Sequence, residues 1–288
     1  MITTGTAFVS ASLASGVLTP VVRRLSLRFG ALDYALTSRK IHGRPIPRLG
    51  GIAIVLAFYA PLSALLLVNS EMGRRFWANG SQAIGLFGGG LVIAALGVYD
   101  DLKGANARTK FAVQFAVAAA MYAVGFRIDR IANPWGAAVE LGWLGLPFTL
   151  LWIVGVINAL NLIDGLDGLA GGVALIAIST TFAIAVLNAD PLMGLFTATI
   201  GGAVLGFLFY NFNPATIFMG DTGSMFLGFV LATTAIQTNH KSSTAVAILV
   251  PIVALGVPIA DTLLAMARRA ARGAPLFSAD RGHIHHRL

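Results

Sequence analysis

Cysteine is absent from the 288 residues of this chain, which excludes disulfides, thiolate nucleophiles and cysteine metal sites. Charge is scarce as well: Asp, Glu, Lys and Arg make up 11% of the residues, against about 25% in soluble domains. The composition is 57% hydrophobic and the mean hydropathy is +0.80. Apolar runs near the roughly 20 residues that cross a bilayer recur along the chain, and no separate soluble domain fits between them. The sequence therefore predicts an all-α, polytopic membrane protein that forms a single transmembrane domain, residues 1–288.

The apolar runs predict nine transmembrane helices, several of which contain glycine or proline, as membrane helices tolerate. These spans cover residues 4–22, 50–68, 82–99, 110–126, 146–163, 169–188, 192–210, 223–240 and 244–266. The first run lacks a basic leader and an evident cleavage site, so it is predicted to be a retained span.

The distribution of positive charge predicts the orientation. The chain has 20 basic and 12 acidic residues, a formal net charge of +8 that could suggest a nucleic-acid partner. Most of the basic residues, however, lie in the loops at one end of the spans, 23–49, 100–110, 164–168, 211–222 and 267–288. The positive-inside rule makes these loops cytoplasmic and places the N-terminus outside. The basic residues are thus assigned to the bilayer and to phosphates, and no nucleic-acid partner is expected.

Aspartates gather on the same predicted side, each where an apolar run ends: Asp100, Asp101, Asp164, Asp167 and Asp221. Like charges repel and each carboxylate loses water at a membrane surface, so such a cluster is costly. A shared divalent cation offsets that cost, and a magnesium ion that bridges phosphates is the usual candidate. The pattern predicts an enzyme.

The adjacent carboxylates Asp100 and Asp101 are expected to have different roles, because neighbouring side chains on a helix point about 100° apart. A solvated helix end is the alternative interpretation. Farther along, polar residues recur every third position from Asn158 through Asn161 to Asp164 at the end of the fifth span. Asparagines inside a span need a partner, which is either a ligand or a neighbouring helix.

The segment 211–224 contains Asp221 just before a predicted helix. Asp221 could cap that helix, or the same helix start could present amides to an anion beside a metal. Phe218 is either a membrane-facing anchor or a flat surface on which a base stacks. The chain ends in a segment with His283, His285, His286 and Arg287, whose spacing fits a zinc site poorly and a pyrophosphate better.

With these motifs in order, the chain resembles the polyprenyl-phosphate N-acetylhexosamine-1-phosphate transferases, glycosyltransferase family 4. The resemblance runs from Asp33 to the last residue, through RKIHGRPIPRLGG, DDLKG, NALNLIDGLDGLAGG, FMGDTGS and HIHHRL. The HIHHR form is similar to the GlcNAc-1-phosphate branch, since the muramoyl-pentapeptide branch has three consecutive histidines.

The resemblance implies transfer of N-acetylhexosamine-1-phosphate, with GlcNAc-1-phosphate as the expected group, from a UDP-sugar to undecaprenyl phosphate, releasing UMP. It implies Mg²⁺ as the cofactor, with Mn²⁺ as the alternative ion. The enzyme would lie in the bacterial inner membrane with its site facing the cytoplasm. There it would start a cell-envelope polysaccharide such as the O-antigen of lipopolysaccharide or a teichoic acid linkage. A homodimer is considered beside a monomer.

Matched by motif, Asp100 resembles the residue that deprotonates or positions the lipid phosphate, with Asp101 beside it as a second catalytic candidate. Asp167 and Asp221 look like magnesium ligands. The substrate-binding candidates are Lys110, Asn158, Asn161, Asp164, Asn211, Phe218, His283, His285, His286 and Arg287. In the family, the asparagines, Asp164 and Phe218 match the nucleotide pocket, while Lys110 and the HIHHR segment match groups that hold phosphates.

Two other functions fit parts of the pattern. An intramembrane prenyltransferase also uses aspartate-rich motifs with magnesium, and Asp164 with Asp167 match its DxxD pattern. A transporter would instead place ionisable groups near the bilayer midplane. For the transferase, direct displacement is favoured over a phospho-aspartate. The family usually has ten or eleven spans and continues past HHRL, so this chain is expected to lack the final helix or helices.

Overall fold

The computed structural model describes residues 2–33, 45–67, 71–78, 80–131 and 139–240, and within these ranges the protein is all-α. The helices are α1 (Ile2–Phe29), α2 (Gly51–Leu67), α3 (Glu71–Ala78), α4 (Gly80–Lys103), α5 (Ala107–Ala123), α6 (Gly145–Ile163), α7 (Leu169–Leu187), α8 (Pro191–Asn211) and α9 (Gly220–His240), with a short 3₁₀ turn, η1 (Gly142–Leu144). Two antiparallel pairs of two-residue strands complete the fold: β1 (Leu32–Asp33) with β2 (Ile46–Pro47), and β3 (Arg130–Ile131) with β4 (Val139–Glu140).

Eight of the predicted spans correspond to helices α1, α2 and α4 to α9, with ends that differ by a few residues. The ninth, 244–266, lies outside the described residues. By length and composition, five of the described helices can cross a membrane (α1, α4, α6 with η1, α7 and α8), and α2 with α3 gives a sixth that bends by 101°. The fold class is confirmed. The side on which the N-terminus lies stays a prediction.

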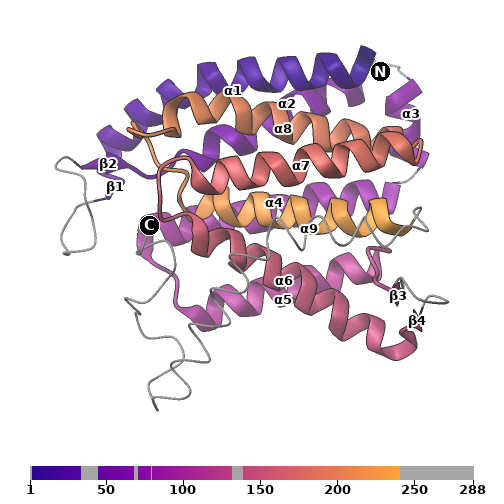
Figure 1. Cartoon of the computed structure of the whole chain (residues 1–288). Coiled ribbons are helices and arrows are strands. Elements are labelled where there is room, and N and C mark those ends of the chain that lie inside the picture. The colour runs from indigo at the N-terminus through magenta and orange to yellow at the C-terminus, as the bar shows by residue number, and fades with distance from the viewer. Residues whose placement is uncertain (1, 34–44, 68–70, 79, 132–138, 241–288) are drawn as a thin grey trace.

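Helix α3 was not among the predicted elements, because its eight residues carry a glutamate and two arginines in place of an apolar run. Tertiary packing explains its presence. Phe76 is buried and lies 5.2 Å, between ring centroids, from Phe87 on α4 and 6.3 Å from Phe196 on α8. The helix therefore covers an aromatic cluster at one end of the bundle (Figure 1).

Helix α9 is the central element of the bundle: it packs against α2, α4, α6, α7 and α8 (Figure 1). It is buried from Thr222 to Thr238 despite several threonines. The hydroxyls of Thr233, Thr234 and Thr238 each donate to a backbone carbonyl one turn earlier, at 2.6–2.9 Å, so each of these three hydroxyls finds an acceptor within the helix. The helix can thus be central to the core while remaining less apolar than its neighbours.

Close packing of α1 on α8 depends on two glycines one turn apart. A Cβ atom at Gly202 would lie 2.1 Å from the carbonyl oxygen of Phe8, and one at Gly206 would lie 2.2 Å from that of Ser12. The two backbones touch, as in the small-xxx-small contacts of membrane helices. The Tyr210 hydroxyl adds a hydrogen bond of 3.0 Å to the carbonyl of Gly16.

The loops that carry the aspartates meet at one end of the bundle. In Figure 1 the β1–β2 pair, the start of α9 and the ends of α4 and α8 lie at that end, while α3, β3 and β4 lie at the other. The fold therefore separates a polar, motif-bearing end from an opposite end that carries none of the described motifs.

Substituting Gly202 with alanine should destabilise the protein, since the added methyl meets backbone rather than a movable side chain. Overpacking of this kind costs about 1–3 kcal/mol. Gly155→Ala on α6 is the matched control, because nothing lies within 4 Å of its added methyl. Thermal unfolding of the detergent-solubilised protein should show a lower midpoint for Gly202→Ala and a midpoint at or above wild type for Gly155→Ala. Equal midpoints for the two variants would contradict the α1–α8 contact.

Candidate active site

A lysine joins two of the predicted aspartates. The Nζ atom of Lys110, on the first turn of α5, donates to Oδ2 of Asp100 at 2.5 Å and to Oδ2 of Asp221 at 2.6 Å. Asp100 lies on the last turn of α4 and Asp221 on the first turn of α9, so the lysine connects three helices. Its side chain is 18% exposed, so water screens this ion triad weakly.

The turn between α4 and α5 is built to place this lysine. Gly104 has φ +73°, a left-handed conformation that glycine adopts readily after a helix, and its amide donates to the Asp100 carbonyl at 2.9 Å. The Asp100 carboxylate accepts from the amide of Ala105. Asn106 caps α5 by accepting from the Thr109 amide at 2.8 Å. Helix α5 therefore begins at a fixed point, three residues before Lys110.

Asp101 faces away from its neighbour Asp100 and is 5% exposed. Its Oδ1 accepts from the Asp221 amide at 2.9 Å. Its Oδ2 accepts from the Thr222 amide at 3.0 Å and from the Thr222 hydroxyl at 2.6 Å. The expectation that the two adjacent carboxylates differ in role is met in their contacts, since one pairs with an amine and the other with a helix start.

The end of α6 brings Asn161 and Asp164 to the same place. The Asn161 side chain donates to the Ser224 hydroxyl at 2.9 Å. Burial, followed by the charges of Asp221 and Asp101, raises the pKa of Asp164 to about 8, while a hydrogen bond from the Gly220 backbone acts in the opposite direction. Three carboxylates thus act on one another across α4, the α6–α7 turn and α9.

Asp167 contacts a different part of this end. Its Oδ2 accepts from the Ala215 amide at 2.9 Å and from the Asn213 side chain at 3.4 Å. Asn211, which is buried, accepts from the Gly168 amide at 3.2 Å and donates to the Ile217 carbonyl at 3.0 Å. These contacts hold the turn after α8 against the turn after α6. Metal binding by Asp167 and nucleotide binding by Asn211 stay predictions.

Asn158 forms hydrogen bonds within the bundle. Its Nδ2 donates to Oε1 of Gln114 at 2.6 Å and to the Val154 carbonyl at 2.8 Å. Gln114, which is fully buried on α5, was not among the predicted site residues, although a glutamine inside a span is the same signal as an asparagine. The sequence left two partners open for Asn158, a ligand or a neighbouring helix. In the structure Asn158 contacts a neighbouring helix, α5.

Phe218 is held by its backbone, whose amide donates to the Pro47 carbonyl at 2.8 Å and whose carbonyl accepts from Gly50 at 3.0 Å. Its ring is partly exposed, so both interpretations of the side chain remain open. Nearby, the buried Nε of Arg48 has no hydrogen-bond partner among the residues that the structure describes. The four C-terminal candidates, His283, His285, His286 and Arg287, lie outside those residues.

The acidic cluster suits a divalent cation in chemistry and charge. Within the described part of the chain, no group of three or more His, Cys, Asp or Glu side chains is close enough to hold a metal ion. The amine of Lys110 occupies the position between Asp100 and Asp221. Carboxylate oxygens are nevertheless the ligands that Mg²⁺ takes. Burial, followed by the charges of Asp221 and Asp101, raises the pKa of Asp164, and a cation would offset those charges. Metal binding by Asp221, like that by Asp167, stays a prediction.

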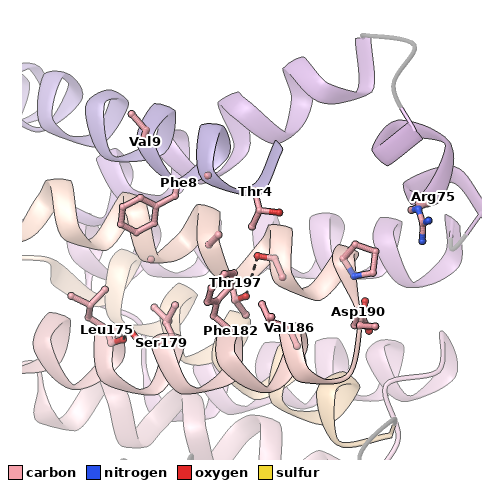
Figure 2. A pocket seen from close by; sticks show the side chains of 18 residues that line it. Thr4, Phe8, Val9, Arg75, Leu175, Ser179, Phe182, Val186, Asp190 and Thr197 are labelled. Atoms are coloured by element: carbon pink, nitrogen blue, oxygen red, sulfur yellow. Dashed lines mark hydrogen bonds between the residues drawn. The ribbon is translucent and has the colours of Figure 1, made fainter. Parts of the chain in front are cut away.

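A cavity of about 840 Å³ lies at the opposite end of the bundle, between α1, α7 and α8 (Figure 2). Phe8, Phe182 and Thr197 line it, and Arg75 and Asp190 lie at one end. Asp190 is buried and caps α8 through the Met193 amide, a structural role. None of the predicted site residues lines the cavity, so we assign the site to the aspartate end.

The fold and this site define a polytopic membrane protein with a carboxylate and lysine cluster where its helices end, the arrangement expected of a membrane-embedded transferase. Within that class the chain belongs to glycosyl transferase family 4, whose profile matches residues 83–239. The predicted family is confirmed.

Three relatives show how far the similarity extends. A Bacillus subtilis protein named "Probable undecaprenyl-phosphate N-acetylglucosaminyl 1-phosphate transferase" is 39% identical over 283 residues, 98% of this chain and 76% of the relative. The decaprenyl-phosphate N-acetylglucosaminephosphotransferase of Mycolicibacterium smegmatis is 36% identical over 97% of this chain and 73% of its own length. The phospho-N-acetylmuramoyl-pentapeptide-transferase of Listeria monocytogenes is 32% identical over 68% of this chain and 62% of its own length.

The raised pKa of Asp164 predicts a pH-dependent stability. Between the ordinary aspartate pKa of about 3.9 and the value of about 8, the folded protein binds a proton that the unfolded chain has released. The free energy of unfolding should therefore fall as the pH rises through this window when no divalent ion is present.

Asp164→Asn should remove most of that fall, measured as unfolding midpoints at pH 5 and pH 8 in chelator. Asp129→Asn, at an exposed aspartate of the far end, should keep it. An unchanged pH dependence in Asp164→Asn would contradict the electrostatic arrangement.

Proposed function

We propose that this protein transfers GlcNAc-1-phosphate from UDP-GlcNAc to undecaprenyl phosphate and releases UMP, as the first membrane step of a cell-envelope polysaccharide pathway. The two relatives with the higher identities are named for a polyprenyl phosphate and N-acetylglucosamine. The observation that carries the proposal is the ion triad of Asp100, Lys110 and Asp221, where three helices meet. The site would face the cytoplasm of the bacterial inner membrane.

The reaction joins two anions, so charge repulsion is its main obstacle. An oxygen of the lipid phosphate attacks the β-phosphorus of the UDP-sugar, and the bond from that phosphorus to the oxygen of the leaving UMP breaks. Lys110, which donates to both carboxylates, would turn its ammonium to a substrate phosphate, because a lysine side chain is flexible and carries three donors. Asp100, held at the end of α4 by the Ala105 amide, would orient the lipid phosphate or accept its proton.

Asp221 and Asp164 would hold Mg²⁺, with Asp167 as the further predicted ligand. The bound ion would neutralise the pyrophosphate and stabilise the UMP that leaves. Asn161 and Phe218 would contact the nucleotide, and Lys110 would be joined at the phosphates by the histidines and arginine of the C-terminal segment. The lipid phosphate is itself the nucleophile, so one direct displacement suffices and no phospho-aspartate is required.

The position of the aspartates disfavours the alternative of a transporter. Transport sites lie near the bilayer midplane, often between broken helices. Here Asp100, Asp164 and Asp221 lie at the ends of α4, α6 and α9. A site at the end of the spans can receive one substrate from water and the other from the bilayer, as the proposed reaction needs.

The reaction is tested with the purified 288-residue chain, Mg²⁺, undecaprenyl phosphate and a panel of UDP-sugars, with UMP release as the readout. UMP should form with UDP-GlcNAc only when undecaprenyl phosphate is present. The lipid product should contain two phosphates, the one of the lipid and the one transferred with the sugar. If UMP forms with UDP-N-acetylmuramoyl-pentapeptide and with no other UDP-sugar of the panel, the result would assign the chain to the muramoyl branch. Absence of UMP with every UDP-sugar would overturn the proposal.

Asp221→Asn should lower kcat by at least about 100-fold, since the loss of a charge that stabilises the transition state has effects of that size. The variant should insert and unfold like wild type, because the backbone contacts of residue 221 are kept. Asp129→Asn is the matched control and should retain wild-type kcat. Near-normal turnover in Asp221→Asn would remove this residue from the reaction.

A further inference from the structure

The start of α9 lacks the usual source of a cap. The first amides of a helix have no acceptor within the helix, and a Ser, Thr, Asp or Asn just before the helix commonly supplies one. The two residues that precede Asp221 are Met219 and Gly220, and neither has a side-chain oxygen. The acceptor comes instead from α4, where both carboxylate oxygens of Asp101 accept from the first turn of α9.

The surrounding backbone leaves little space for any other partner of this carboxylate. A Cβ atom at Gly97, one turn before Asp101, would lie 2.4 Å from the Thr222 Cα. A Cβ at Gly220, whose φ is +70°, would lie 2.8 Å from both oxygens of Asp101. The carboxylate is thus enclosed between two helices and accepts three hydrogen bonds, out of a capacity of about four.

We propose that Asp101 is a positioning residue that fixes the Asp221 carboxylate by capping α9 from the neighbouring helix, and that it takes no direct part in proton transfer or metal binding. The inference rests on the proposed function for the meaning of Asp221. It revises the sequence-based expectation that Asp101 is a second catalytic residue. Asp100 alone of the pair contacts Lys110 and keeps that role.

Asp101 can affect the position of the Asp221 carboxylate because the amide that it holds and that carboxylate belong to the same residue. Asp221 is both the residue whose amide Asp101 holds and the residue whose carboxylate meets Lys110. A frayed first turn would move that carboxylate, and a misplacement of about 1 Å can cost about 100-fold in rate. The loss should appear in kcat, because Asp101 itself forms hydrogen bonds with Asp221 and Thr222 and with none of the residues assigned to the nucleotide.

The Thr222 hydroxyl gives the mildest test, because its hydrogen bond to Asp101 is the one that it donates within the described part of the chain. Thr222→Val removes the hydroxyl with little change of shape, and Thr222→Ser restores it. Thr233→Val is the control on the same helix: this buried hydroxyl donates only to backbone carbonyls of its own helix. We expect kcat to fall about 3- to 10-fold in Thr222→Val, a partial effect because the two backbone hydrogen bonds to Asp101 remain, with KM for the UDP-sugar within about twofold. The serine variant and the control should keep wild-type kcat.

Asp101→Asn supplies the second measurement. One amide oxygen replaces two carboxylate oxygens, so kcat should fall by at least about 30-fold, again with little change in KM. The double variant with Thr222→Val should lose less than the product of the two single losses, because both substitutions break the same contact. Hydrogen exchange of the peptide covering residues 219–227, measured without substrates, should speed up in both single variants and not in Thr233→Val.

Two results would overturn the inference: wild-type kcat in Thr222→Val, or unchanged exchange of the 219–227 peptide in an Asp101→Asn variant that has lost activity. The second would indicate a direct catalytic role for Asp101. The exchange measurement needs no turnover, so it tests the cap even if the wild-type protein fails to release UMP. Failure of the proposed function and failure of the cap are therefore distinguished.

Discussion

The organisation of this protein depends on one electrostatic constraint, the gathering of several carboxylates around the start of α9. Two unit charges 4 Å apart interact by about 4 kcal/mol at an effective dielectric constant of 20, so like charges need compensation there. The structure supplies three kinds: the amine of Lys110 for Asp100 and Asp221, the first turn of α9 for Asp101, and loop amides for Asp167. Burial, followed by the charges of Asp221 and Asp101, raises the pKa of Asp164, against a hydrogen bond from the Gly220 backbone.

Lys110 and the first turn of α9 can offset the charges of the aspartates only if the start of α9 is held in place. Close backbone contacts hold it there. A Cβ at Gly51 of α2 would lie 2.1 Å from the Gly223 amide nitrogen, and one at Gly97 of α4 would lie 2.4 Å from the Thr222 Cα. The Gly51 amide also donates to the Met219 carbonyl at 2.7 Å. Glycines in two other helices thus let the first turn of α9 approach them, and the acidic cluster is built on that contact.

The sequence predicted the features that depend on local pattern. Apolar runs located eight of the described helices, and the ends of those runs placed the aspartates on one side. Contacts that depend on helix rotation and register were not predictable: that Lys110 bridges Asp100 and Asp221, that Asp101 caps α9, and that Asp167 holds the turn after α8. Each joins residues far apart in the chain, and their partners are set by how the helices pack.

The same comparison separates two kinds of polar residue in a membrane bundle. Amide side chains inside the spans meet other helices: Asn158 meets Gln114, and Asn161 meets Ser224. These two side chains are neutral, and a neutral polar neighbour on another helix satisfies each of them. Carboxylates are charged and need a cation or a helix start, which this fold offers only where its helices end. The depth of a polar group in the bundle, together with its charge, therefore determines what satisfies it: a neutral partner on another helix inside the bundle, or a cation or a helix start where the helices end.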